Sequence, residues 1–398
     1  MKKLLFIFLI GFMANAQNVS YDTNFELEDY NFVLGTNNIA GKYQFTNESK
    51  LIEQTKHIRA MGSNILKVSL GKKSIKQYGL QQGKYKSTLE LFKANPEFKQ
   101  AFDMDFKYIF AWVHTATNIN WKNRINEKEE KILYDEIFEF ASYILKEYNN
   151  SSKTFLIGNW EGDWLLHPNF NRNFDVPQHH VDNMTKWFLI RQKAIDDAKK
   201  AVAYKNVEMY YYVEVNLVLK AMKAETSISN NILHKVNPDL VSYSSYEAIK
   251  NRSYTEKKET LEEIFTFLEK QLQPKENIPF TRRVYLGEFG YHANKNKPAS
   301  YAKQDRENKE IMLISLELNL PFSLHWQLYN NEYAKNGDSK EMSLINEAGI
   351  KRPLYYLHQN YYKQMNQYLI DFKHKNGSYP SQLEFNKVAF KTLQNLEL

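Results

Sequence analysis

The segment T-F-L-I-G-N-W-E-G-D-W, residues 154–164, contains the start of the pattern that decides the fold. Its first five residues are a short apolar run, which predicts a buried β-strand over 154–158. A longer connection then leads to a helix over about 182–203, where apolar residues recur at helical spacing. Strand, loop and amphipathic helix in this order make one β/α unit.

The same alternation recurs along the chain. Further strands are predicted at about 33–35, 64–70, 106–114, 207–215, 240–244, 283–287 and 322–326. Further helices are predicted at about 48–61, 127–148, 302–318 and 353–372, and a capping box, Ser253-Tyr-Thr-Glu256, opens one more.

Eight strands with helices between most of them favour parallel pairing through right-handed crossovers. The sequence therefore predicts a single-domain α/β fold, a (β/α)8 TIM barrel, over residues 17–372. An open doubly wound sheet is the rival, and it is disfavoured because no Gly-rich phosphate loop follows the first strand.

The two ends of the chain carry different signals. Lys2 and Lys3 precede an apolar run over 4–12 and then Ala14-Asn15-Ala16, which is the order of features in a secretory signal peptide. We therefore predict a signal peptide over 1–16 and a secreted or periplasmic protein. The apolar run is too short for a bilayer span, and no other stretch approaches that length. Residues 373–398 are predicted to form a C-terminal tail of unknown role.

Composition narrows the classes of partner. A formal net charge of +7 is mild for 398 residues, so a solvated basic surface explains it better than nucleic-acid binding, while an acidic polysaccharide stays compatible. Aromatic residues make up 15%, and sugar-binding clefts need flat apolar faces. No dinucleotide or phosphate loop, H-E-x-x-H or G-x-S-x-G motif occurs, so no cofactor, metal or serine-esterase chemistry is predicted. The oligomeric state is left open.

Two carboxylates stand where predicted strands end. Glu161 follows the fourth strand in G-N-W-E-G-D-W (158–164), and Glu288 follows the seventh in L-G-E-F-G (286–290). The loops after the strands form the active-site face of a barrel, and strands four and seven face each other across its mouth. Retaining glycoside cleavage needs two carboxyls about 5–5.5 Å apart. Both residues are therefore candidate catalytic groups, and Asp163 is the competing acid.

This pattern resembles clan A glycoside hydrolases over most of the chain, from about Phe32 to Leu357. Its most specific pieces are the two glutamate motifs and L-H-W-Q (324–327). The resemblance implies Glu161 as acid/base, Glu288 as nucleophile and Trp326 as an aromatic platform beneath the sugar. It also implies that Tyr243 or Tyr246, in V-S-Y-S-S-Y, supplies a hydroxyl that touches the nucleophile.

Two departures from the clan pattern place the chain in a divergent branch. The clan normally has Asn directly before the acid/base, whereas Trp160 here separates Asn159 from Glu161. It commonly has Arg near the end of strand two, where this sequence has Lys67, a point donor without the guanidinium fork. We expect Asn159, Trp160 and Lys67 to bind or orient groups in the cleft.

Two histidines near strand ends, His114 and His325, are candidates for binding sugar hydroxyls, and each is equally compatible with a structural role.

The sequence thus predicts a secreted retaining hydrolase that cleaves a poly- or oligosaccharide by double displacement. Two alternatives stay open. A catalytically silent carbohydrate-binding barrel would keep Trp112, Trp160, Trp164 and Trp326 as stacking surfaces without the carboxylate geometry. A transglycosylase would use the same residues. The sugar, its linkage, and endo or exo action depend on loop shapes that a sequence pattern does not define.

Overall fold

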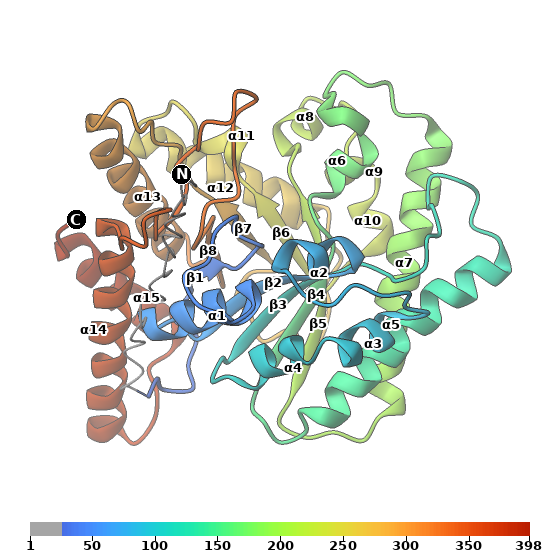
Figure 1. Cartoon of the computed structure of the whole chain (residues 1–398), viewed down its shortest axis with the longest axis horizontal. Coiled ribbons are helices and arrows are strands. Elements are labelled where there is room, and N and C mark those ends of the chain that lie inside the picture. The colour runs from blue at the N-terminus through green and yellow to red at the C-terminus, as the bar shows by residue number, and fades with distance from the viewer. Residues whose placement is uncertain (1–25) are drawn as a thin grey trace, which may run out of the picture.

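A computed structural model describes residues 26–398, so the predicted signal peptide and its cleavage site lie outside the described residues. The fold is a closed parallel barrel in which each strand pairs with the next and the first pairs with the eighth (Figure 1). This confirms the predicted single-domain (β/α)8 architecture. Its strands are β1 (Leu34–Asn37), β2 (Ile65–Leu70), β3 (Tyr108–Val113), β4 (Thr154–Gly158), β5 (Glu208–Val215), β6 (Leu240–Ser244), β7 (Val284–Phe289) and β8 (Ser323–His325).

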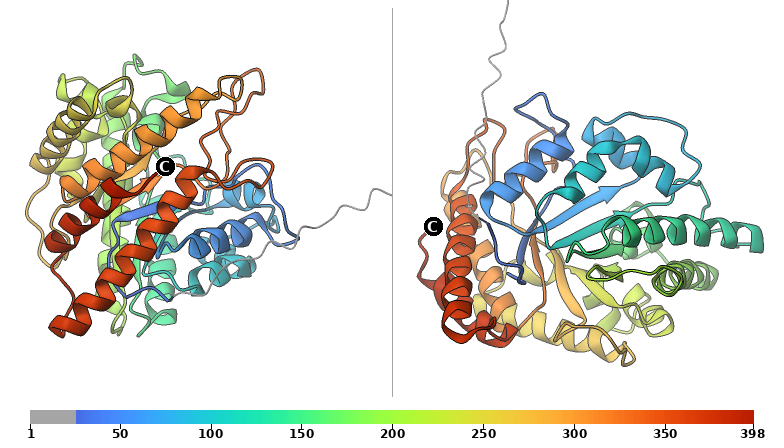
Figure 2. Two further views of the ribbon diagram at one scale, coloured as in Figure 1. Left: turned by 90° about the vertical axis from the view of Figure 1, so that its left-hand side faces the viewer. Right: turned by 90° about the horizontal axis from the view of Figure 1, so that it is seen from below.

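Helices form a layer around the outside of the barrel, as the view in the right panel of Figure 2 shows. The long ones are α1 (Lys50–Met61), α5 (Glu127–Glu147), α7 (Gln178–Ala201), α12 (Tyr254–Lys270), α13 (Ala299–Glu317), α14 (Pro353–Asn376) and α15 (Gln382–Asn395). Shorter ones lie in the connections: α2 (Lys72–Tyr78), α3 (Thr88–Ala94), α4 (Pro96–Asp103), α6 (Gly162–Leu166), α8 (Val218–Met222), α9 (Ile228–Asn231), α10 (Leu233–Val236), α11 (Tyr246–Ile249) and the 3-10 turn η1 (Pro168–Phe170). Within residues 26–398, none of the helices has the length and apolarity that crossing a bilayer requires.

Aromatic rings fill the barrel interior. Strand alternation turns one set of side chains inward, and that set includes Tyr108, Phe110, Tyr212, Tyr285 and Phe322. Rings of this size need small neighbours, because a Cβ on Gly158 would lie only 2.3 Å from the Tyr212 ring. Above this apolar layer, toward the carboxyl ends of the strands, the interior becomes polar.

A β-bulge in β7 sets the direction of Glu288. Tyr243 of β6 pairs with Leu286, but the next β6 residue, Ser244, pairs with Glu288, so Gly287 is an extra residue in β7. A Cβ on Gly287 would lie 1.7 Å from a β6 hydroxyl oxygen, which leaves room for glycine only. The bulge turns Glu288 into the barrel. The sequence placed the end of this strand at 287, whereas β7 continues to Phe289 and contains Glu288.

The C-terminal segment over 373–398 is helical and packed. Helix α14 continues to Asn376 and ends at Gly377, whose φ of 73° is the left-handed conformation that glycine favours. A capping box then starts α15, whose buried residues include Phe385 and Leu393. Helix α15 packs against α13 and α14, so this segment completes the outer helical layer (Figure 1).

Candidate active site

Glu161 and Glu288 meet at the carboxyl end of the barrel. Glu161 follows β4 and is half-buried, and Glu288 is almost fully buried. Ser244 links them, because its hydroxyl donates to Glu161 Oε1 at 2.6 Å while its backbone lies in register with Glu288. The hydroxyl of Tyr246 lies 3.4 Å from Glu288 Oε2. The two carboxyls that the sequence singled out therefore face one small region of the barrel mouth.

A third glutamate, Glu214 of β5, connects several residues of this region through hydrogen bonds. It was not among the predicted site residues. Its Oε1 accepts the backbone N–H of Glu161 at 3.1 Å, and its Oε2 accepts from Lys67 Nζ and from Ser242, each at 2.8 Å. Glu214 is fully buried. The sequence pattern could have indicated Glu214, because it follows Tyr210 and Tyr212 at the two-residue spacing that places side chains on one face of a strand.

Lys67 is the buried cation of the site. Its Nζ donates to the Gly287 carbonyl at 3.0 Å and lies 3.7 Å from Glu288 Oε1, above the ring of Trp112 at 4.5 Å. The contact with Glu214 is shorter, at 2.8 Å. Lys67 is therefore buried beside Glu288, its shorter ion pair is with Glu214, and its effect on Glu288 is that of a nearby positive charge.

The surroundings of the two carboxyls disfavour their charged forms. Burial raises the pKa of Glu161 to about 8, although the Ser244 hydrogen bond lowers it. Burial raises the pKa of Glu288 well above its ordinary value, the Lys67 ammonium lowers it, and the charge of Glu161 raises it further. Two negative charges are therefore costly here, and both carboxyls favour the protonated form more than an ordinary glutamate does.

Asp163, the competing acid, has a different environment. It is fully buried, its Oδ2 accepts the backbone N–H groups of Asn216 and Leu217 at 2.9 and 3.1 Å, and its Oδ1 accepts that of Ile228 at 2.9 Å. These three bonds hold the connections after β5 against the start of α6. Asp163 is thus an anchor for loops and is not available to protonate a substrate.

The two residues just before Glu161 have different roles: Asn159 is held by hydrogen bonds, and Trp160 presents an aromatic ring. The Asn159 amide donates to the carbonyls of Trp160 and Glu214, and its oxygen accepts from the Glu214 N–H. These bonds join the loop after β4 to β5, so Asn159 positions the loop and leaves its amide little capacity for a ligand. Trp160 is half-buried, and its ring lies 6.4 Å from that of Phe170, which is 64% exposed.

Trp326 lies just beyond β8 and turns into the barrel. Its ring packs against Trp112, with centroids 6.1 Å apart, and only 6% of the residue is exposed. The peptide bond between Trp326 and Gln327 is cis. Trp326 therefore lies in the same interior cluster as Trp112, whose ring is beneath Lys67.

Two predicted site residues face away from the cleft. Tyr243 points outward and packs against Phe265 of α12, since strand alternation gives the inward positions of β6 to Ser242 and Ser244. His325 points outward and lies against Phe289 and His358, where burial lowers its pKa well below the usual value. Tyr243 and His325 therefore do not face the cleft as expected, and Tyr246 is the tyrosine near Glu288.

His114 lies directly after β3 and is exposed, with its backbone N–H bonded to the Leu70 carbonyl at 2.9 Å. Its ring remains a candidate for contact with a ligand. Among the side chains of residues 26–398, no group of three His, Asp or Glu is arranged to hold a metal ion.

Comparison with known proteins finds likeness in structure but not in sequence. No family model and no curated protein sequence matches the chain. The Bacteroides uniformis beta-glucuronidase superposes with a TM-score of 0.55 at 11% identity, over 84% of this chain and 35% of that one. A family 5 xyloglucanase from Paenibacillus pabuli superposes with a TM-score of 0.51 at 12% identity, over 83% and 97%. A GH5_18 variant from Bifidobacterium longum, in complex with Manb1-4GlcNAc, gives 0.55 at 10%, over 83% and 78%.

These similarities establish the fold. The chain spans about a third of the length of the glucuronidases it matches. It has the barrel architecture of several carbohydrate-active proteins, and its function rests on the site itself.

Proposed function

We propose that this protein is an exported, retaining glycoside hydrolase in which Glu161 is the general acid/base and Glu288 the nucleophile. One observation carries the proposal. The Glu161 carboxyl accepts from Ser244, whose backbone is paired in register with Glu288, and each of the two carboxyls accepts few hydrogen bonds from the protein. Export rests on the signal-like first sixteen residues of the sequence.

The first step forms a glycosyl-enzyme. Glu161 donates its proton to the glycosidic oxygen, the bond from that oxygen to the anomeric carbon breaks, and a carboxylate oxygen of Glu288 bonds to the anomeric carbon. The raised pKa of Glu161, about 8, suits a group that has to hold a proton at neutral pH. The Lys67 charge, 3.7 Å from Glu288, favours the ionised nucleophile.

The second step returns the enzyme to its starting state. Glu161, now a carboxylate, takes a proton from water, whose oxygen bonds to the anomeric carbon while the ester bond to Glu288 breaks. Lys67 and the Tyr246 hydroxyl stabilise the carboxylate that leaves. Transfer to a second sugar in place of water would make the same residues a transglycosylase.

Trp326 and Tyr246 have supporting roles in this proposal. Trp326 lies at the end of β8 in the interior cluster, and we assign its indole to the floor beneath the sugar at the cleavage point. Tyr246 is the tyrosine hydroxyl expected beside the nucleophile, at 3.4 Å from Glu288 Oε2.

The stereochemistry of the product tests the proposal. The purified protein is incubated with a panel of polysaccharides, and the first product formed is observed by proton NMR before its anomers equilibrate. We expect the product to keep the anomeric configuration of the substrate, and mass spectrometry separates hydrolysis from transfer. Inverted product would remove Glu288 as nucleophile. Sugar binding without turnover of any panel member would instead identify a silent carbohydrate-binding barrel.

A further inference from the structure

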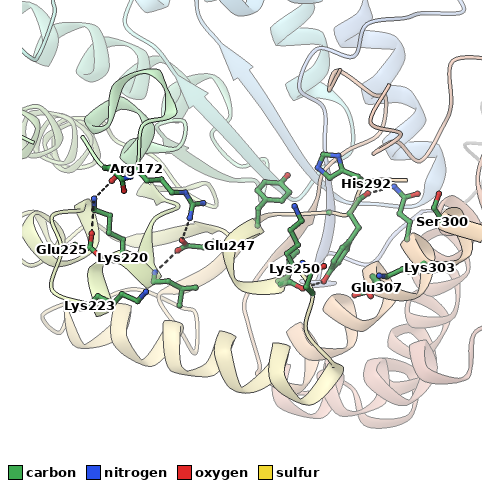
Figure 3. Close-up of a pocket in the computed structure, with 18 residues that line it drawn as sticks. Arg172, Lys220, Lys223, Glu225, Glu247, Lys250, His292, Ser300, Lys303 and Glu307 are labelled. Atoms are coloured by element: carbon green, nitrogen blue, oxygen red, sulfur yellow. Dashed lines mark hydrogen bonds and ion pairs between the residues drawn. The ribbon is translucent and has the colours of Figure 1, made fainter. Parts of the chain in front are cut away.

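A large pocket lies beside the catalytic pair. Its volume is about 840 Å³, within the range of about 300–1,000 Å³ typical of ligand sites. Tyr246, which contacts Glu288, forms part of its wall, and so does Gly290, two residues beyond Glu288. The remaining walls come from the loop that follows η1, from α8 and α11, and from α13 (Figure 3). The pocket therefore adjoins the side of the site on which Tyr246 contacts Glu288.

The lining of the pocket is charged and mainly basic. Five cationic side chains and three acidic ones face it: Arg172, Lys220, Lys223, Lys250 and Lys303, with Glu225, Glu247 and Glu307. Figure 3 shows these groups spread along both halves of the pocket, with Lys250 between them.

Each acidic group is already paired. Glu247 accepts the Leu219 N–H at 2.9 Å and lies 3.6 Å from Arg172, and Glu225 lies 3.6 Å from Lys220. Glu307 pairs with the buried Lys257 of α12. The acids of the pocket are therefore neutralised by cations within the protein.

Three lysines of the pocket are left without an acidic partner in the described part of the chain. Lys223, Lys250 and Lys303 are exposed, and none has an acidic group within ion-pair distance among residues 26–398. They come from α13 and from the ends of α8 and α11, so three separate connections bring an ammonium group to one pocket. Their positive charge is available to a ligand.

The pocket also has an ordered polar and aromatic wall. The Tyr291 hydroxyl donates to the Ile249 carbonyl at 2.9 Å, which ties the loop after β7 to α11. Gln304 of α13 donates to the Tyr291 carbonyl and so fixes the same loop from the other side. The rings of Tyr246 and Tyr291 offer flat faces of the kind that pack against sugar rings.

We propose that this pocket binds an anionic sugar residue next to the one held at Glu288, so that the substrate is an acidic glycan. The inference rests on the proposed function for the place of the cleaved bond. The anion is a carboxylate or a sulfate ester, since both present oxygen acceptors to ammonium groups. Lys223, Lys250 and Lys303 are its specificity-determining residues.

Binding to matched pairs of glycans tests this without any turnover. Glu288→Gln protein is run in native gels that contain oligogalacturonides or their methyl esters, and sulfated galactans or their desulfated forms. We expect the charged member of at least one pair to retard the protein, with an affinity about ten-fold above that of its neutral partner. Added salt should reduce this preference. The pair that responds identifies the carboxylate or the sulfate as the anion.

A triple substitution ties the preference to the pocket. K223Q/K250Q/K303Q should bind the charged and neutral members within about two-fold of each other, since most of the ionic contact is lost. The control K128Q/K200Q/K391Q removes the same charge from exposed lysines outside the pocket and should keep the preference. Equal binding of both members of every pair, or equal losses in the two triple variants, would overturn the inference. Because this readout needs no catalysis, a failure of the hydrolase proposal is detected separately, by the NMR experiment.

Discussion

Two carboxylates in one short segment, Asp163 and Glu161, have opposite surroundings. Asp163 accepts three backbone N–H groups and is fully buried, whereas the side chain of Glu161 accepts one hydroxyl, that of Ser244. The difference separates a carboxyl that holds the fold together from one that remains available for chemistry. The Glu161 carboxyl, with one donor, has a pKa raised by burial to about 8.

The same contrast holds elsewhere in the barrel. Glu53 accepts from the backbone of Phe45 and Thr46 and from the Tyr329 hydroxyl, and Glu136 accepts from the backbone of Thr88, Ala116 and Thr117. Glu288 has a single hydroxyl contact, and its Oε1 accepts no hydrogen bond from the described residues.

Replacing Glu288 gives the largest expected effect. Glu288→Ala removes the proposed nucleophile, so kcat should fall by roughly 10⁴-fold or more on every substrate, since no covalent intermediate forms. The melting temperature should change little, because Lys67 retains its ion pair with Glu214. Activity assays and thermal unfolding of the same sample measure both. A variant that keeps a tenth of the activity would show that Glu288 is not the nucleophile.

Replacing Glu161 should give a loss that depends on the leaving group. Glu161→Ala should reduce kcat/KM by roughly 10²–10⁴-fold on natural glycans, which need a proton from the enzyme. Aryl glycosides with acidic phenols need no such proton, so the loss of the first step should be much smaller for them. Azide should then accelerate the second step and give a glycosyl azide, detectable by mass. Equal losses on both substrate types, with no azide product, would contradict the assignment.

The barrel itself was predictable because it depends on repeated local patterns. Runs such as 154–158 and 240–244 became strands with those bounds, and Ser253 and Glu256 form the predicted capping box. The segment 373–398 was harder to interpret, since the role of α15 depends on its packing against α13 and α14.

The site was predictable only where a residue's position along the chain was enough. Glu161 and Glu288 could be found from their strands, but the bulge at Gly287 that turns Glu288 inward depends on register with β6. Tyr243 and Tyr246 could not be separated, because the inward face of β6 is decided in three dimensions. The Lys67–Glu214 pair joins residues far apart in sequence, so no local pattern indicates it.

Replacing Asp163 should affect stability more than chemistry. Asp163→Asn keeps the size of the side chain but places an NH2 group against backbone N–H donors, so unfolding should become easier by about 2–4 kcal/mol. At a temperature where the variant is fully folded, its kcat should stay within a few-fold of the parent. Urea unfolding and activity at that temperature measure the two effects. A loss of kcat as large as that of Glu161→Ala, with unchanged stability, would exchange the roles of the two carboxyls.

The smallest expected effect is the pH dependence of the unmodified protein. The acid has to be protonated for the first step, so kcat/KM should fall above the raised pKa of Glu161, about 8, by about ten-fold per pH unit. The nucleophile has to be ionised, so activity should also fall on the acidic side. Because burial raises the pKa of Glu288, the acidic fall in activity should occur at a higher pH than the pKa of an ordinary carboxyl would give. The acidic and alkaline limbs of this pH profile give apparent pKa values of the pair, because the two carboxyls titrate as one coupled unit.

Glu161→Ala separates the two limbs. On an aryl glycoside with an acidic phenol, this variant should lose the alkaline limb, since no proton donor remains to be titrated. It should keep an acidic limb at nearly the same pH, because Glu161 is still protonated and uncharged in the unmodified protein at the pH where Glu288 ionises. Initial rates over pH 4–10, with folding checked by circular dichroism at each end, give both limbs. An alkaline limb that persists unchanged in Glu161→Ala would mean that another group supplies the proton, and the contrast between Asp163 and Glu161 would then not identify the acid.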